Sequence, residues 1–130
     1  MTTLLCIDDD KNRLLRYEQE FGFEGYEVIT AANGREALDK AQDLHPDIIL
    51  MDTNNLQVGD LEAIGRIIGK NRRDPIIVHT AYSDKRGKFI SWAVDAHLVK
   101  TPDLSELKST IEELLTDEPE SLYYNEIINM

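Results

Sequence analysis

The chain has 130 residues and a net charge of -11, with 14 Lys and Arg against 25 Asp and Glu. This length suits one domain with its own hydrophobic core. The acidity argues against nucleic acid as a direct ligand. Cys6 is the only cysteine, which excludes an internal disulfide. The N-terminus has no basic region and only a short apolar run, so we expect a cytoplasmic protein without signal peptide or membrane contact.

Short apolar runs alternate with helical patterns along the whole chain. Apolar residues at helical spacing predict helices near residues 14–21, 37–44, 61–68, 84–92 and 104–115. The alternation is typical of repeated βα units, and it predicts an α/β fold with a doubly wound, five-stranded parallel sheet and helices on both faces. The apolar runs predict strands at residues 4–7, 26–30, 47–51, 75–79 and 96–99.

The last predicted helix carries the clearest boundary signals. Asp103 followed by Glu106 resembles a capping box, and Pro119 is predicted to end the helix. From these signals we expect a domain at residues 1–116 and an acidic tail at residues 117–130. The tail contains apolar pairs without Lys or Arg, and three outcomes stay open for it: extension of the helix, partner binding, or disorder.

Polar residues follow four of the five predicted strands. The carboxyl ends of parallel strands meet at one edge of a sheet, where open α/β folds place their ligand sites. We therefore expect these residues to converge although they are far apart in sequence. They are Asp8, Asp9 and Asp10 after the first strand, Asp52 after the third, Thr80 after the fourth and Lys100 after the fifth.

This set of residues predicts phosphoryl chemistry. Partly buried carboxylates repel one another, so the cluster should require a cation. Oxygen ligands in a small, loose cluster favour Mg²⁺. Together with a metal, Lys100 and Thr80 would supply the partners that phosphoryl oxygens need. The expected event is nucleophilic attack by Asp52 on phosphorus, which gives an acyl phosphate.

Four short motifs occur in an order and spacing that indicate a known family. They are Ile7 to Asp10, Asp47 to Asp52, Thr80-Ala81, and Lys100. With these motifs, roughly residues 3–116 resemble the receiver domain of bacterial two-component response regulators. The resemblance implies a flavodoxin-like fold with strand order 2-1-3-4-5. It also implies a signalling domain rather than an enzyme, with self-phosphorylation and autodephosphorylation at most. The phosphoryl donor would be a histidine kinase or a histidine phosphotransfer protein.

The family pattern assigns roles to the residues around the acids. It makes Asp52 the phosphoacceptor and gives Mg²⁺ to Asp9, Asp52 and the backbone carbonyl of Asn54, with Asp8 acting through water. Lys100 would contact the phosphoryl oxygens.

The family pattern also implies a switch and an output surface. Thr80 would turn inward to bind a phosphoryl oxygen, and His97 occupies the place of the switch aromatic that follows this turn. Asn54 and Tyr82 match positions that tune the lifetime of the phosphoryl group. A downstream protein would bind the surface around residues 84–105, with the chain a monomer or a weak homodimer.

Two segments depart from the family pattern. Leu56 replaces a common proline, and Gly59-Asp60 replaces an Asp-Gly pair, so the loop after Asp52 is expected to take a different turn. The proline that normally follows the lysine at once comes one residue later here, after Thr101. Because a cis bond before threonine would cost roughly 3 kcal/mol, we predict that the Lys100–Thr101 bond is trans.

Two other functions remain open on the sequence alone. Asp8-Asp9-Asp10 after an apolar strand imitates the Asp-x-Asp motif of haloacid-dehalogenase-like phosphatases. That interpretation makes Asp8 the nucleophile and leaves Asp52 without a role. The altered loop instead favours a degenerate receiver that binds partners without phosphorylation. His45 and His79 are interpreted as structural residues.

Overall fold

The structure is a computed structural model that describes residues 1–52, 66, 75–80 and 95–128. Its centre is a parallel sheet with the strand order β2-β1-β3-β4-β5. This order confirms the predicted doubly wound fold. The strands are β1 (Thr3–Ile7), β2 (Glu27–Ala31), β3 (Ile48–Met51), β4 (Ile76–Thr80) and β5 (Ala96–Val99).

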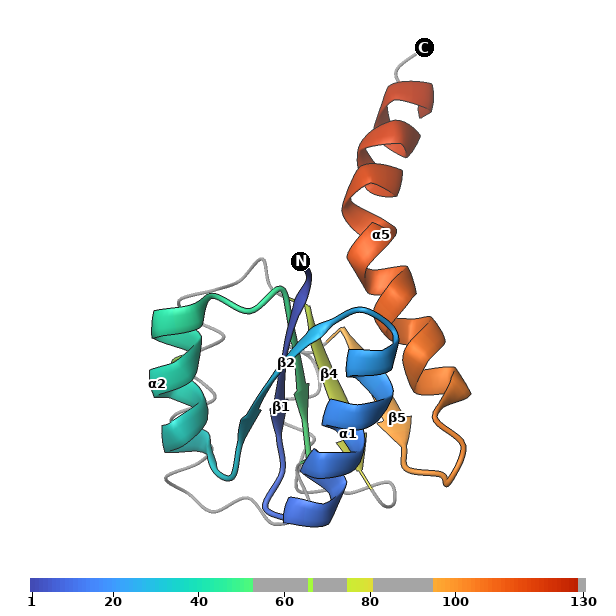
Figure 1. The fold of residues 1–130 in the computed structure, drawn as a ribbon. Coiled ribbons are helices and arrows are strands. Elements are labelled where there is room, and N and C mark those ends of the chain that lie inside the picture. Colours follow the sequence, from blue (N-terminus) through green and yellow to red (C-terminus); the bar gives the residue numbers. More distant parts are fainter. Residues whose placement is uncertain (53–65, 67–74, 81–94, 129–130) are drawn as a thin grey trace.

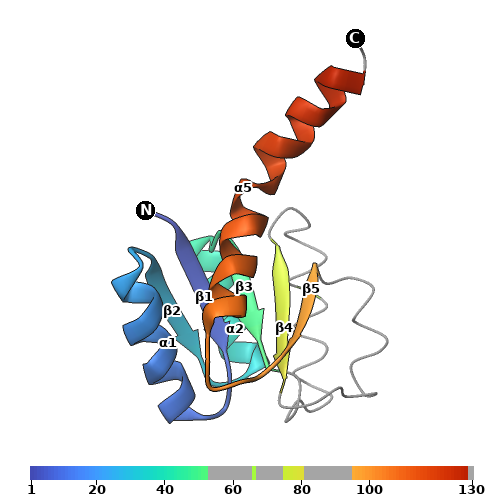
Figure 2. The same ribbon diagram turned by 90° about the vertical axis from the view of Figure 1, so that its right-hand side faces the viewer.

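Helices cover both faces of the sheet. They are α1 (Lys11–Phe23) and α5 (Ser105–Ile128) on one face and α2 (Gly34–Leu44) on the other (Figures 1 and 2). The predicted helices at residues 61–68 and 84–92 lie outside the described residues, except for Arg66, which is helical. No described helix is both long and apolar enough to cross a membrane.

The central strands β1 and β3 are buried on both faces, which explains their almost continuous apolar sequences. In β1, Leu4 and Cys6 belong to the core under α1 and α5, whereas Leu5 and Ile7 belong to the core under α2. This alternation follows from the two-residue period of a strand. Cys6 is fully buried, as expected for a small hydrophobic residue.

Polar side chains fix the ends of the first two helices. The Asp10 carboxylate accepts hydrogen bonds from the backbone N–H groups of Asn12 and Arg13 and so caps α1. Asn33 caps α2 by accepting from the N–H of Glu36. His45 ends α2 in the left-handed region with φ of 47°. The predicted end of this helix at His45-Pro46 is thus confirmed.

The last helix corrects one prediction. Asp103 accepts hydrogen bonds from the N–H and hydroxyl groups of Ser105, as expected of a capping acid. However, α5 continues through Pro119 to Ile128, so the prediction that Pro119 ends the helix was wrong. A proline removes one backbone hydrogen bond and crowds the preceding turn, and a helix can absorb this by a local kink. Extension of the helix is the outcome seen for residues 117–128.

The segment after β5 agrees with the predicted backbone. None of the described peptide bonds is cis, so the Lys100–Thr101 bond is trans as predicted. The Arg16 guanidinium donates to the carbonyl of Pro102, and this contact ties the segment to α1. The chain then enters α5, which runs back along the sheet and projects beyond it, away from the carboxyl ends of the strands (Figure 1).

Candidate functional site

Two acids lie side by side at the carboxyl edge of the sheet. Asp8 follows β1 and Asp52 follows β3, and these strands are neighbours. The Asp52 N–H donates to the carbonyl of Ile7 at 3.0 Å, which extends the strand pairing up to the acids. Asp8 is 2% exposed and Asp52 is 7% exposed. Their charges therefore need partners inside the protein.

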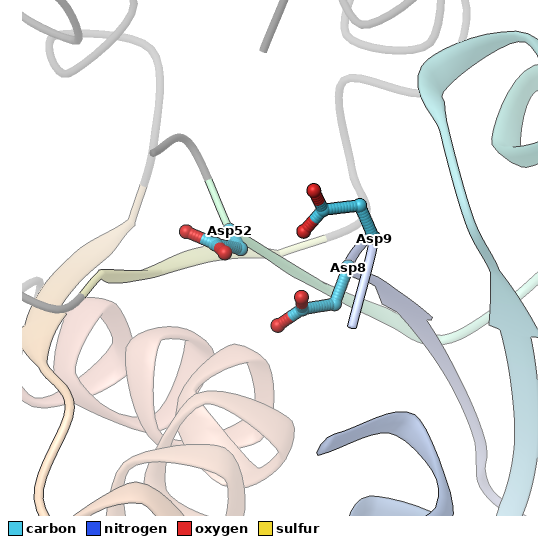
Figure 3. A group of neighbouring side chains, drawn as sticks. All are labelled: Asp8, Asp9 and Asp52. Carbon is cyan, nitrogen blue, oxygen red and sulfur yellow. The ribbon is translucent and has the colours of Figure 1, made fainter. Parts of the chain in front are cut away.

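A third acid completes an oxygen cluster. One carboxylate oxygen from each of Asp8, Asp9 and Asp52 lies within 4.8 Å of the others (Figure 3). Asp9 is the exposed member of this group. Opposite ligands of a six-coordinate Mg²⁺ are about 4.2 Å apart, so small side-chain rotations would bring the three oxygens onto one ion. The donor set therefore fits a hard divalent cation.

Lys100 reaches this cluster from the end of β5, as the sequence predicted. Its Nζ lies 2.8 Å from Oδ2 of Asp52 and 3.4 Å from Oδ2 of Asp8. The sheet brings these residues together although Lys100 and Asp52 are 48 positions apart in the chain. The ammonium group compensates both buried acids at once.

Arg13 is a second cation of the site, and the sequence analysis missed it. Its Nη1 lies 2.9 Å from each carboxylate oxygen of Asp8 and 3.5 Å from Oδ2 of Asp52. The only available signal was its place in the first turn of a helix that follows directly after the acids. Arg13 and Lys100 together compensate the charges of the two buried acids.

The contacts of Arg13 are reflected in its own pKa. Burial lowers the pKa of the guanidinium, but the hydrogen bond and the charge of Asp8 outweigh burial, so that the pKa is raised overall. Arg13 also lies 3.5 Å from Oδ2 of Asp10, measured from Nη2. The guanidinium is thus held among three carboxylates and stays charged at any ordinary pH.

A buried polar pair lies next to the site on the face covered by α1. The Tyr17 hydroxyl is hydrogen bonded to Nδ1 of His79 at 2.7 Å, which joins α1 to β4. Burial, followed by the charges of Lys100 and Arg13, lowers the pKa of His79 to about 4. Burial and the charge of Asp8 raise the pKa of Tyr17. Both side chains are therefore neutral at pH 7, and His79 fits its predicted structural role.

The remaining predicted site residues are placed only in part. The backbone of Thr80 ends β4 and pairs with Val99, so it reaches the same edge of the sheet as Lys100. His97 lies in β5 in register with Val78. Asn54, Tyr82 and the unusual loop from Leu56 to Asp60 lie outside the described residues. Their predicted roles stay predictions.

Known proteins resemble the chain over most of its length. It is 34% identical over 122 residues to the response regulator ArlR of Staphylococcus aureus, an alignment that covers 92% of this chain and 55% of ArlR. The chain thus spans about half the length of the curated relatives it matches.

Solved structures show the same similarity. The response regulator TrrA of Thermotoga maritima, in complex with Mg(2+)-BeF, is 37% identical with a TM-score of 0.79, covering 88% of this chain and 99% of TrrA. The chemotaxis protein CheY4 of Vibrio cholerae is 29% identical with a TM-score of 0.75, covering 88% of this chain and 98% of CheY4.

A second structure shows TrrA in complex with the histidine kinase ThkA, where the receiver is again 37% identical, with a TM-score of 0.76 and the same coverage of 88% and 99%. The model of the response regulator receiver domain matches residues 4–112. With the strand order and the acidic edge described above, this match leads to one conclusion. The chain belongs to the family of response regulator receiver domains. Receiver domains are signalling domains rather than enzymes.

Proposed function

We propose that Asp52 accepts a phosphoryl group from a histidine kinase or a histidine phosphotransfer protein. The observation that carries this proposal is the position of the Asp52 carboxylate, buried beside Asp8 and 2.8 Å from the Lys100 ammonium. Asp8 and Asp52 flank the point where the strand order reverses between β1 and β3. Open α/β sheets bind their ligands at this point.

Asp52 suits the role of nucleophile better than Asp8. The carboxylate of Asp8 accepts hydrogen bonds from the N–H of Asp10 and from Arg13, and both of its oxygens contact the guanidinium. These donors stabilise its charge and lower its nucleophilicity. The phosphatase hypothesis, which needs Asp8 as the nucleophile, also leaves Asp52 without a role, although Asp52 lies within the same site.

Mg²⁺ is the proposed cofactor. Asp8, Asp9 and Asp52 would hold it, together with the backbone carbonyl of Asn54 that the family pattern adds. When bound, the ion would neutralise charge on the phosphoryl oxygens. Lys100 would contribute a second positive charge from the protein itself. The TrrA complex with Mg(2+)-BeF supports this assignment.

A change of charge at Asp52 would alter the neighbouring strand ends. Thr80 and Lys100 end adjacent strands at the same edge, and the proposed response passes from Thr80 to His97 and then to the surface around residues 84–105. We also propose that residues 1–116 are the receiver domain. A kinase partner is supported by the complex of TrrA with ThkA.

The test is chemical labelling. The protein is incubated with Mg²⁺ and acetyl phosphate or phosphoramidate, and the modified residue is mapped by mass spectrometry. Label on Asp52 supports the proposal, label on Asp8 supports the phosphatase, and no label supports the degenerate receiver. Asp52→Asn should abolish labelling. Asp39→Asn is the matched control, because it removes the same charge from an exposed position of α2 and should leave labelling unchanged.

A further inference from the structure

Arg13 lies where a metal ion would be expected to act. Its Nη1 contacts both oxygens of Asp8 at 2.9 Å and lies 3.5 Å from Oδ2 of Asp52. A positively charged group therefore bridges two of the three carboxylates that form the oxygen cluster. The position belongs to the first turn of α1, and the side chain is 31% exposed, so that it can leave towards solvent.

Two side-chain cations share the same acceptor atoms. Oδ2 of Asp8 lies 2.9 Å from Arg13 and 3.4 Å from Lys100, and Oδ2 of Asp52 lies 3.5 Å from Arg13 and 2.8 Å from Lys100. Three carboxylates thus face two positive charges before any metal arrives. A divalent ion entering this cluster would be repelled by both cations at short range in a partly buried site.

We propose that Arg13 is a resident counter-cation that Mg²⁺ must displace from Asp8, so that Arg13 sets the affinity of the site for the metal. The inference rests on the proposed Mg²⁺ site and adds a residue that controls its occupancy. Lys100 is the buried partner of Asp52, with a side chain that is 12% exposed, and stays in place. Arg13 is the more exposed of the two and is the cation that moves.

A displaced guanidinium keeps a partner near its starting position. Nη2 of Arg13 lies 3.5 Å from Oδ2 of Asp10, whose side chain is 45% exposed. Asp10 also caps α1, so its carboxylate is held close to the helix start whether or not Arg13 contacts Asp8. The exchange therefore needs only a side-chain rotation at the edge of the site. The helix itself keeps its cap.

This arrangement has two linked consequences. Without metal, Arg13 stabilises the folded protein because it compensates Asp8, which would otherwise face Asp52 with less positive charge nearby. With metal, the same contact has to be broken and weakens binding. Removal of the guanidinium should therefore lower the stability of the metal-free protein and raise its affinity for Mg²⁺, and only a competing cation gives these two effects together.

The experiment measures Mg²⁺ binding to the whole chain by isothermal titration calorimetry. Arg13→Gln should bind Mg²⁺ about tenfold more tightly than the unmodified chain, and Arg13→Lys should fall between them. Arg16→Gln is the matched control, because it removes the same charge one turn further along α1. The Arg16 guanidinium contacts the carbonyl of Pro102 rather than the acids, so the affinity of this variant should stay unchanged.

Thermal unfolding with and without Mg²⁺ gives a second readout that does not depend on phosphorylation. The rise in Tm caused by Mg²⁺ should be larger for Arg13→Gln than for Arg16→Gln, since tighter binding stabilises the folded state more. Equal or weaker Mg²⁺ binding by Arg13→Gln would overturn the inference and leave the proposed metal site intact. Absence of Mg²⁺ binding by every variant would overturn both.

Discussion

On the face covered by α2, strands β1, β3 and β4 contribute Leu5, Ile49 and Val78 to one hydrophobic core cluster. On the face covered by α1 and α5, the same three strands contribute Leu4, Leu50 and, on β4, both Ile77 and His79. Among the described residues, a buried titratable side chain with a polar partner is therefore found under α1. The α2 face has no counterpart within this part of the chain.

This difference separates two properties of the molecule. Apolar burial stabilises both faces, and its free energy does not depend on pH. Ionisation acts on one face, where Tyr17 and His79 lie close enough to Arg13 and Lys100 to respond to their charges. Perturbations of the acidic site should therefore reach the α1 face first.

The largest expected effect tests whether the two faces are equally well packed. Ile49 and Leu50 are adjacent in β3, point to opposite faces and are almost completely buried. Ile49→Ala and Leu50→Ala should each lower the free energy of unfolding by about 2–5 kcal/mol, measured by urea denaturation at neutral pH. Similar losses of unfolding free energy in the two variants would show that the two faces are equally well packed and differ only in their buried polar groups. A much smaller loss at one position would show unequal packing instead.

The next effect concerns the pH dependence of the α1 face. The folded protein holds the pKa of His79 at about 4, below the value of 6.5 for a free histidine. Between pH 6.5 and pH 4, His79 is protonated in the unfolded chain but stays neutral in the folded protein. Protonation therefore favours the unfolded chain, and stability that is fully present above pH 6.5 is lost as the pH falls to 4. We expect a loss of roughly 2–3 kcal/mol from this residue.

The measurement compares urea denaturation across this pH interval in three proteins. The double variant Tyr17→Phe with His79→Leu removes both polar partners, so it leaves no buried polar atom of the pair unpaired. Its stability should fall less between pH 6.5 and pH 4 than that of the unmodified chain. Tyr17→Phe alone keeps the histidine and should keep the full slope. Equal slopes in all three proteins would assign the acid sensitivity to other groups.

The smallest effect is expected where α1 contacts α5 at the surface. Lys108 on α5 lies 2.9 Å from Glu20 of α1 and 3.3 Å from Glu24, the residue that directly follows this helix. The hydrogen bond and charge of Lys108 lower the pKa of Glu20. These side chains are half-buried or exposed and reach solvent, so Lys108→Gln should change stability less than the core and histidine substitutions, and the change should disappear in high salt. A large loss that persists in salt would show that this contact belongs to the core of the face.

Much of this structure followed from simple patterns in the sequence. Short apolar runs located the five strands, because strands buried on both faces have almost continuous hydrophobic sequences. The rule that parallel strands end at one edge of a sheet predicts that Asp8, Asp52 and Lys100 lie together. These predictions depend on the backbone alone and do not require knowledge of side-chain conformations.

The features that escaped prediction depend on side chains or on competition between local and longer-range effects. Arg13 points back across the start of its helix to Asp8, and helical periodicity carries no information on that direction. The pairing of Tyr17 with His79 joins residues 62 positions apart. At Pro119 the local preference for a helix end was overridden, and α5 continues to Ile128. Each case needs tertiary context that a single sequence does not supply.

The length of α5 has a consequence for the dynamics of the chain. Its 24 residues correspond to about 36 Å, roughly twice the length of a five-residue strand. The last turn contains no basic residue, and the sequence places Glu126 in this turn, at the negative end of the helix dipole. Backbone amide hydrogens at this end of α5 should therefore exchange with solvent much faster than the amide hydrogens of the sheet. Slower exchange there, when another molecule is added, would report binding to the far end of the protein without a label at the acidic site.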